Sequence, residues 1–420
     1  MNLSPDRRIL LVDADAFYVA VARLVDPDGA GRASLLIVGG SVEGRGVVTS
    51  ASYEARAYGV HSAMPMARAV RLCPGAMVVP VPWEACAAKG DQIRDVLVHF
   101  TPQVERASSD EFYLDLSGTE RLYRDEPLVT TARRIREAVD GQTGLKVSIG
   151  GGTSKFVAKL AAGVAKPRVG SGADGVHVVA PGAEEEFLRR FSLADLPLVG
   201  PKAQERLARL GLRTVTDVLG QARAQLVARL GEREGGWLYD RARGIDPAPV
   251  ESRDVPQSLS RDETFPRDLS DDDSLATELL RLADRASADL REAGLVARTV
   301  SVKLRDADFT TRQASRTLPL PVQSDRVVYA VARELLEKLR AARRVPARLV
   351  GVSLSQLLPM DAKTQLSLFE RAQDIGPETD RDRAIARAMD ELRERFGSTA
   401  VTRAIHLGRD TGMQVPLLPD

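Results

Sequence analysis

A stretch without hydrophobic periodicity divides this chain and so limits the ways in which it can fold. Residues 241–256 carry Gly244, Pro247, Pro249 and Pro256, and their apolar residues follow neither helical nor strand spacing. We interpret 244–256 as a linker. Segments with helical or strand spacing of apolar residues lie on both sides of it, so we expect separately folded regions rather than one continuous core.

Before the linker, short apolar runs alternate with helical patterns up to about residue 180. The strand-like runs lie at 8–12, 34–38 and 145–152, and the helical patterns at 16–25, 84–100, 126–139 and 154–164. Only helical patterns follow, at 184–243. This order predicts an α+β region followed by a helical one.

After the linker, residues 257–357 form a second α+β pattern. Two helices are predicted near 273–293 and 325–341, with strands at 299–305, 312–318 and 348–355. Its charge is polarised, since 251–297 carries 6 basic and 12 acidic residues and 298–348 carries 12 basic and 5 acidic. A basic sheet face or edge suits a phosphate backbone. A solvated face without a ligand is the alternative.

Composition excludes several classes of protein. The 44% of hydrophobic and 28% of charged residues are typical of a globular chain. No apolar run approaches the ~20 residues that cross a bilayer, and no basic-then-apolar leader opens the chain, so we expect a cytoplasmic protein without a membrane contact. Two cysteines and four histidines argue against a disulfide framework and a Cys/His zinc site. Any catalytic metal would have to be held by carboxylates.

Two acidic clusters lie where strands end or turn. Asp13 ends the first predicted strand, and Asp110 and Glu111 lie in a tight connection between two strand-like pieces. If these strands are neighbours, three carboxylates converge, and Mg²⁺ prefers such oxygen ligands together with substrate phosphates. Two ions ~4 Å apart would stabilise an in-line phosphoryl displacement. Taken singly, each acid would be an ordinary surface or turn residue.

Basic residues near these acids indicate phosphate binding. Tyr53 and Arg56 are spaced i, i+3 on one helical face, from which a phenol and a guanidinium can both reach a triphosphate. An ordinary amphipathic helix start is the alternative. Lysine occurs nine times against 50 arginines, and four of the nine fall within 146–166. This window suits a phosphate-facing site, although a solvated helix would also explain it.

Four motifs in order resemble the Y-family of translesion DNA polymerases, especially its bacterial DNA polymerase IV branch. They are Val12–Tyr18 (VDADAFY), Ser52–Val60 (SYEARAYGV), Ser109–Asp115 (SDEFYLD) and Lys155–Pro167 (KFVAKLAAGVAKP). Each alone would be a weak signal, but their order and separation are specific, and the resemblance runs along nearly the whole chain.

The resemblance implies a role for each matched residue. Asp13, Asp110 and Glu111 correspond to the catalytic carboxylates that bind two Mg²⁺ ions, with Mn²⁺ as a possible substitute, and the carbonyl of Ala14 completes one metal's ligands. The residues expected to bind the nucleotide are Tyr53, Arg56 and Lys166 at the triphosphate, Tyr18 as the steric gate against a ribose 2′-OH, and Phe17 beneath the sugar. Asp15 is expected to have no direct metal role.

Two residues depart from the family pattern beside the acidic pair. Phe112 stands where a small residue is usual and Ser109 where an aliphatic one is usual, so we expect altered packing near the metals. Gly151, Gly152 and Thr153 form a variant of the usual strand-to-helix turn.

The family's fold is a right-hand polymerase, an α+β multidomain architecture with a ferredoxin-like palm, small fingers, a helical thumb and an α+β little-finger domain. On this chain we expect the palm at 1–16 and 83–172, fingers at 17–82, thumb at 173–243 with a helix-hairpin-helix at 196–211, a linker at 244–256, the little finger at 257–357 and a tail at 358–420. Lys303, Arg305 and Arg316 would lie along the DNA backbone.

The tail contains a pentapeptide that resembles the bacterial sliding-clamp binding peptide. Gln365, Leu366, Leu368 and Phe369 are its anchors. Five residues can match by chance, but a short apolar motif in a polar segment is typical of linear recognition peptides. The beta subunit of the clamp is therefore an expected partner, beside primer-template DNA and dNTP, and we expect a monomer.

The function predicted is template-directed DNA synthesis, in which a primer 3′-OH attacks the α-phosphate of a dNTP and pyrophosphate leaves. The resemblance implies low fidelity, translesion synthesis and no proofreading. Two alternatives remain open at this point. One is a catalytically silent, clamp-bound accessory protein in DNA damage tolerance, and the other is a nucleotide cyclase-like enzyme, which can share a two-metal α+β palm.

Overall fold

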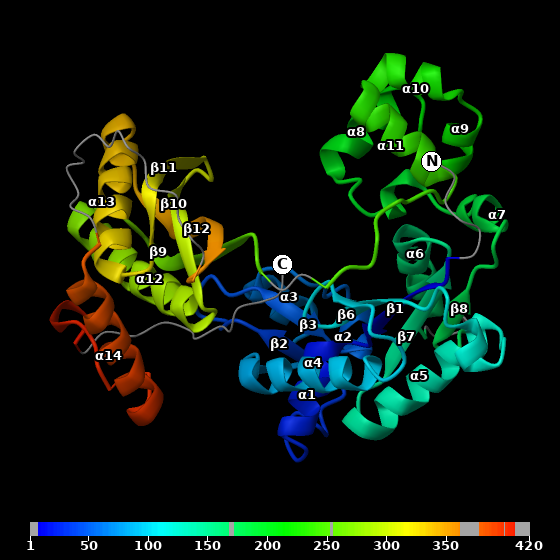
Figure 1. The fold of residues 1–420 in the computed structure, drawn as a ribbon, viewed down its shortest axis with the longest axis horizontal. Coiled ribbons are helices and arrows are strands. Elements are labelled where there is room, and N and C mark those ends of the chain that lie inside the picture. The colour runs from blue at the N-terminus through cyan, green and yellow to red at the C-terminus, as the bar shows by residue number, and fades with distance from the viewer. Residues whose placement is uncertain (1–6, 168–171, 253–254, 362–377, 399, 408–420) are drawn as a thin grey trace. The chain divides into compact units, whose positions relative to one another are not determined.

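The computed structural model describes residues 7–167, 172–252, 255–361, 378–398 and 400–407. These fold into two compact units, one formed by residues 7–40 and 47–252 and the other by residues 41–46 together with the described residues from 255 onwards (Figure 1). The predicted linker contains the boundary between them. None of the described helices has the length and hydropathy that a membrane span requires.

The first unit is built on a five-stranded sheet. Its strands, in spatial order, are β5 (Val104–Arg106), β6 (Glu111–Asp115), β1 (Ile9–Ala14), β7 (Val147–Gly152) and β8 (Val176–Val178). The central strand β1 is antiparallel to both of its neighbours. β8, which the sequence patterns missed, adds a parallel edge strand beside β7.

The two faces of this sheet are covered by different helices. Leu10 and Val12 of β1 belong to the core that also contains residues of α1 (Phe17–Val25), α4 (Trp83–Leu97) and α5 (Leu128–Thr143). Ile9 and Leu11 pack with residues of α6 (Lys155–Ala165). This alternation follows from the two-residue period of a strand, and it turns Asp13 towards the α6 side.

Glycine allows α6 to pack unusually close to the sheet. A Cβ atom at Gly150 would lie 2.0 Å from the backbone nitrogen of Ala162 and 2.1 Å from the carbonyl oxygen of Ala158. No side chain fits there, so helix and strand meet backbone to backbone. Gly151 and Gly152 belong to β7, as the strand-like run at 145–152 predicted, so the turn also predicted at 151–153 was wrong at these two positions. A Cβ atom at Gly152 would lie 2.6 Å from the side chain of Val157 on α6, whereas one at Gly151 would meet Leu10 and Val178.

A smaller three-stranded sheet and a helical cluster complete the first unit (Figure 1). The sheet has the order β3 (Val48–Ala51), β2 (Leu36–Gly39), β4 (Met77–Val79), and it packs with α2 (Tyr53–Ala57) and α3 (Met66–Leu72). The cluster consists of α7 (Glu184–Leu188), α8 (Pro201–Arg209), α9 (Val215–Leu219), α10 (Arg223–Leu230) and α11 (Glu232–Ala242). Phe156 and Leu160 of α6 belong to the core of this cluster.

The second unit is a four-stranded antiparallel sheet with helices on one face. The strand order is β11 (Thr311–Val322), β10 (Leu295–Asp306), β12 (Ala347–Pro359), β9 (Ser258–Leu269), and the helices are α12 (Asp272–Glu292) and α13 (Asp325–Ala342). Both helices and three of the strands were predicted. β9 was missed because its sequence is polar and contains Pro266, which is compatible with an edge strand.

A further helix, α14 (Asp380–Phe396), confirms the helical pattern near 380–397 and belongs to the second unit. Ion pairs join it to α12. Arg291 binds both carboxylate oxygens of Asp390 at 2.6 and 2.9 Å, and Arg393 binds Asp284 at 2.7 Å. Arg291 also donates to the carbonyl of Gln323 and is only 5% exposed. Part of the segment assigned to a tail is therefore docked on the second unit.

Arg291→Ala is expected to lower the free energy of unfolding of the second unit by about 2 kcal/mol, because it leaves Asp390 without its partner in a half-buried contact. Arg333→Ala is the control, since its pair with Glu337 on α13 is well exposed and contributes at most about 0.5 kcal/mol. Calorimetric unfolding of both variants measures the difference. Equal midpoints would contradict a stabilising contact between α12 and α14.

Candidate active site

Three acidic side chains meet at one end of the central sheet. Asp13 on β1 lies directly opposite Glu111 on β6 in the antiparallel register, so both side chains project from the same face. Asp110 precedes Glu111, and its carbonyl accepts a hydrogen bond of 3.0 Å from the backbone nitrogen of Ala14. The sheet thus brings together the three acids that were singled out in the sequence.

Each of these acids is turned to a partner of its own. Lys166 Nζ lies 2.8 Å from Oδ1 of Asp13, and Lys159 Nζ donates to both oxygens of Glu111 at 2.7 and 2.9 Å. The hydroxyl of Ser108 donates to Asp110 at 2.7 Å. Among the described residues, no group of three acidic, histidine or cysteine side chains is arranged to hold a metal ion. In this structure lysine ammonium groups balance two of the three acids.

The electrostatics of the acids favour added positive charge. Burial raises the pKa of Asp13 to about 6 despite the opposing effect of Lys166, and the charges of Glu111 and Asp110 act in the same direction as burial. Burial likewise raises the pKa of Asp110. Burial alone would lower the pKa of Lys166, but the charge of Asp13 and the hydrogen bond to it raise that pKa overall. Neighbouring carboxylates in a partly buried site are a suitable set of donors for a hard divalent cation.

An aromatic cluster follows the end of β1. Ala16 has a left-handed backbone (φ 46°) and redirects the chain from the strand into α1. Tyr18 then makes edge-on contacts with Phe17 and Trp83, whose ring centroids lie 5.3 and 5.9 Å away, and its hydroxyl donates to Ser109 at 3.4 Å. Phe17 is 1% exposed and belongs to the hydrophobic core, so the ring that Tyr18 contacts is itself fixed by packing. Trp83 was not singled out by any pattern in the sequence, and its role follows only from its contact with Tyr18.

Helix α2 contributes the predicted phenol and guanidinium. The guanidinium of Arg56 lies 5.2 Å from the ring centroid of Tyr53, and its Nε donates to the carbonyl of Ala51 at 2.9 Å. Burial raises the pKa of Tyr53, and the nearby charges that act on it include Asp15, Lys166 and Asp13. The start of α2 therefore adjoins the acids. Asp15 itself accepts a hydrogen bond from Ser148 of β7 at 2.8 Å.

The two departures beside the acidic pair have different consequences. Phe112 is fully buried in the core on the α4 and α5 side, opposite to the face that carries Glu111. Its ring contacts the guanidinium of Arg106, which donates to the carbonyl of Ser108 beside Asp110, so any effect of Phe112 on the acids is indirect. Ser109 does adjoin the site, because it accepts the hydrogen bond from Tyr18.

Comparison with protein families matches three parts of the chain. Residues 12–163 match the impB/mucB/samB family, residues 256–368 match the C-terminal domain of the same family, and residues 194–246 match the thumb domain of DNA polymerase-iota. The DNA polymerase IV of Alkalilimnicola ehrlichii is 38% identical over 86% of this chain and 99% of its own length. That of Halorhodospira halophila is 39% identical over 86% and 98%.

The chain belongs to the Y-family of DNA polymerases. Solved structures agree in fold. A Y-family DNA polymerase chimera, Dbh-Dpo4(243-245)-Dbh, superposes with a TM-score of 0.74 at 24% identity, covering 84% of this chain and 99% of the chimera. The insertion ternary complex of Dbh DNA polymerase gives 0.58 at 25% identity, over 83% and 98%. The right-hand polymerase fold predicted from the sequence is thereby confirmed.

In this Y-family chain, the basic residues expected on the second unit's sheet are divided between its faces. Lys303 and Arg305 lie on the face away from the helices, in register with Gln313 and Thr311 of β11. Arg316 lies opposite the fully buried Val300 and pairs with Glu334 of α13, so it is on the helix side. The two-residue period of the strand separates it from Lys303 and Arg305.

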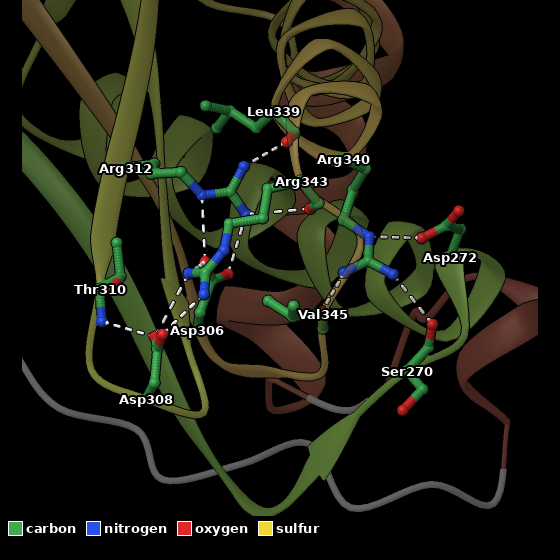
Figure 2. A network of polar contacts seen from close by, with 10 residues as sticks. All are labelled: Ser270, Asp272, Asp306, Asp308, Thr310, Arg312, Leu339, Arg340, Arg343 and Val345. Atoms are coloured by element: carbon green, nitrogen blue, oxygen red, sulfur yellow. Dashed lines mark hydrogen bonds and ion pairs between the residues drawn. The ribbon is translucent and has the colours of Figure 1, made fainter.

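Several further arginines of the basic segment are engaged within the domain (Figure 2). Arg312 binds the fully buried carboxylate of Asp306 at 2.8 Å, and Arg343 binds it at 2.7 Å. Arg343 also binds Asp308, which in turn accepts a hydrogen bond from the backbone of Thr310. In Figure 2 the contacts of Arg312 and Arg343 hold the turn between β10 and β11, and those of Arg340 join the end of α13 to Asp272 and Ser270, so these charges serve folding and are balanced before any ligand binds.

The hairpin before α8 carries the expected helix-hairpin-helix sequence. Gly200 is the N-cap of α8 and Pro201 its first residue, which leaves the next backbone N–H groups free of helical partners. Leu198 in the turn has a left-handed backbone (φ 69°) and is 88% exposed. The turn is therefore strained and presents an apolar side chain to solvent.

Proposed function

We propose that the chain, which is a DNA-directed DNA polymerase by its family membership, transfers nucleotides from dNTP to a primer 3′-OH with the help of two divalent ions. It would copy damaged templates, with low fidelity and without proofreading. The observation that carries this proposal is the register of the sheet, which sets Asp13 opposite Glu111 and beside Asp110. Tyr53 and Lys166 adjoin the same acids.

Asp13, Asp110, Glu111 and the carbonyl of Ala14 are the groups that would hold the ions, with Mg²⁺ as the natural choice and Mn²⁺ as a substitute. The donor set fits, because it consists of carboxylates whose neighbours and burial raise the pKa of Asp13 and Asp110. When bound, such ions activate the attacking hydroxyl and stabilise the leaving phosphate oxygens.

Tyr53, Arg56 and Lys166 would bind the incoming triphosphate. Tyr53 and Arg56 come from one short helix and Lys166 from the end of α6, so donors approach from two sides. When the dNTP binds, Lys166 would leave Asp13 and bind a phosphate oxygen, so its ammonium would be paired both before and after binding. Tyr18 would exclude a 2′-OH from beside the sugar, with Phe17 and Trp83 holding its ring in place.

We assign the palm to 1–16 and 83–172, the fingers to 17–82, the thumb to 173–243 and the little finger to 257–357. The thumb and the little finger would bind primer-template DNA. Lys303 and Arg305 on the open sheet face are the stronger candidates for DNA contacts, because Arg316 lies on the helix side, although Lys303 is paired with Asp262 as Arg316 is with Glu334. If the protein copies chromosomal DNA, it would be located at the nucleoid.

Primer extension tests the proposal. With a short primer-template, Mg²⁺ and one dNTP at a time, the templating base should decide which nucleotide is added. Binding of primer-template without extension would instead favour the silent accessory protein, and failure to bind it would favour the cyclase-like enzyme. Retention of all three acids together with Tyr53, Arg56 and Lys166 supports the polymerase over the accessory protein.

We further propose that the peptide of Gln365, Leu366, Leu368 and Phe369 binds the bacterial sliding clamp. These residues lie outside the described part of the chain, so the proposal rests on their sequence. Deleting 365–369 is expected to remove clamp stimulation of primer extension, about tenfold through lost tethering, while extension without clamp stays the same. Equal stimulation of the deleted and full-length proteins would exclude this peptide as the clamp contact.

A further inference from the structure

Helix α6 sets two lysine–glutamate ion pairs side by side. Lys155 Nζ donates to the two oxygens of Glu105 at 2.5 and 2.7 Å, and Lys159 Nζ donates to those of Glu111 at 2.9 and 2.7 Å. The two lysines are four residues apart and therefore share one face of the helix. The pairs differ in their acid, because Glu111 belongs to the proposed metal site and Glu105 does not.

The Lys159 ammonium binds the same carboxylate that a metal ion would need. Each oxygen of Glu111 accepts one hydrogen bond from it, so the negative charge that would attract a metal ion is already paired with an ammonium. The pair is only partly exposed, at 38% for Lys159 and 22% for Glu111, so water screens it incompletely. The lysines concentrated at 146–166, which the sequence singled out, thereby receive a role beyond phosphate binding.

We propose that Lys159 is a positioning residue that keeps Glu111 in an ion pair until a divalent ion binds, so that ion binding must break the Lys159–Glu111 ion pair. This inference rests on the proposed function, because it requires Glu111 to be a metal ligand. Ammonium and metal compete for one carboxylate, and the metal-free acids stay balanced by the chain's own charges. A dNTP, which brings phosphate oxygens as further ligands, would then shift the competition towards the metal.

The test is a titration of the full-length protein with Mn²⁺, without DNA or nucleotide, in which electron paramagnetic resonance counts the free ion. Lys159→Met is expected to lower the apparent dissociation constant about three- to tenfold, since the competing charge is lost. Lys155→Met is the matched control. It removes the same charge one helical turn away and is expected to change the constant by less than about twofold. Lys159→Arg, which retains the charge, should stay close to wild type.

The comparison of these variants decides whether a change in Mn²⁺ affinity comes from the Lys159–Glu111 ion pair or from the charge of the protein in general. Equal shifts in Lys155→Met and Lys159→Met would show a general effect of charge and overturn the inference, as would unchanged or weaker binding in Lys159→Met.

Glu111→Gln should weaken Mn²⁺ binding about tenfold, and adding Lys159→Met to it should have no further effect. If Glu111→Gln leaves Mn²⁺ binding unchanged, the proposed metal site fails and this inference with it. If Glu111→Gln weakens binding but Lys159→Met does not tighten it, the inference alone fails. Lys159→Gln replaces Lys159→Met should the latter unfold in a thermal melt.

Discussion

Asp110→Asn combined with Glu111→Gln is expected to reduce primer extension at least about 1,000-fold, which corresponds to ~4 kcal/mol of transition-state stabilisation. The substitutions keep the shape of both side chains and remove the negative charges that would hold the divalent ions. Catalysis of phosphoryl transfer consists mainly of positioning and charge neutralisation, so little activity should remain. The measurement is single-turnover extension of a labelled primer.

The control for this pair is Asp115→Asn, at the other end of the same strand. The Asp115 carboxylate accepts a hydrogen bond of 2.8 Å from the backbone of Ser117, which an asparagine oxygen can also accept. Its extension rate should stay within about twofold of wild type. A double variant that extends primers as fast as Asp115→Asn would refute the assignment of the metal site. Unchanged affinity of the double variant for primer-template would show that the loss lies in catalysis.

Tyr18→Ala is expected to raise incorporation of ribonucleotides relative to deoxyribonucleotides about 100-fold, or ~2.7 kcal/mol in the difference between the two barriers. The ring is held by Phe17 and Trp83, so it cannot move aside easily for a 2′-OH. Removing it opens that space. The ratio of kcat/KM for a ribonucleotide and the matching dNTP measures the effect.

Tyr18→Phe separates the ring from its hydroxyl. It keeps the ring and its two aromatic contacts but loses the hydrogen bond to Ser109. Because exclusion depends on the volume of the ring, Tyr18→Phe should discriminate within about threefold of wild type. If Tyr18→Ala discriminates as well as wild type, another residue is the gate. If Tyr18→Phe loses as much discrimination against ribonucleotides as Tyr18→Ala, the hydroxyl and its contact with Ser109 are responsible for the discrimination instead.

Local patterns predicted the helices and most of the strands of this chain, and they failed where tertiary contacts decide. The helices near 273–293 and 325–341 were found because their apolar residues recur at helical spacing. β9 carries no such pattern, since it is a polar edge strand that exists through pairing with β12. Gly151 and Gly152 belong to β7, as the strand-like run at 145–152 predicted, but the close approach of α6 at Gly150 cannot be read from the strand itself.

The sequence by itself determined the family and the residues of the candidate site, because Asp13, Tyr53, Asp110, Glu111 and Lys166 stand in four ordered motifs. Only the tertiary structure decided what each charge faces. The register of β1 with β6 sets Asp13 opposite Glu111, and the packing of α6 places Lys159 on Glu111 rather than in solvent. Strand alternation puts Arg316 on the helix side and Lys303 on the open side. The physical reason is that these ion pairs form between residues far apart in the chain, so they cannot be predicted from local sequence spacing.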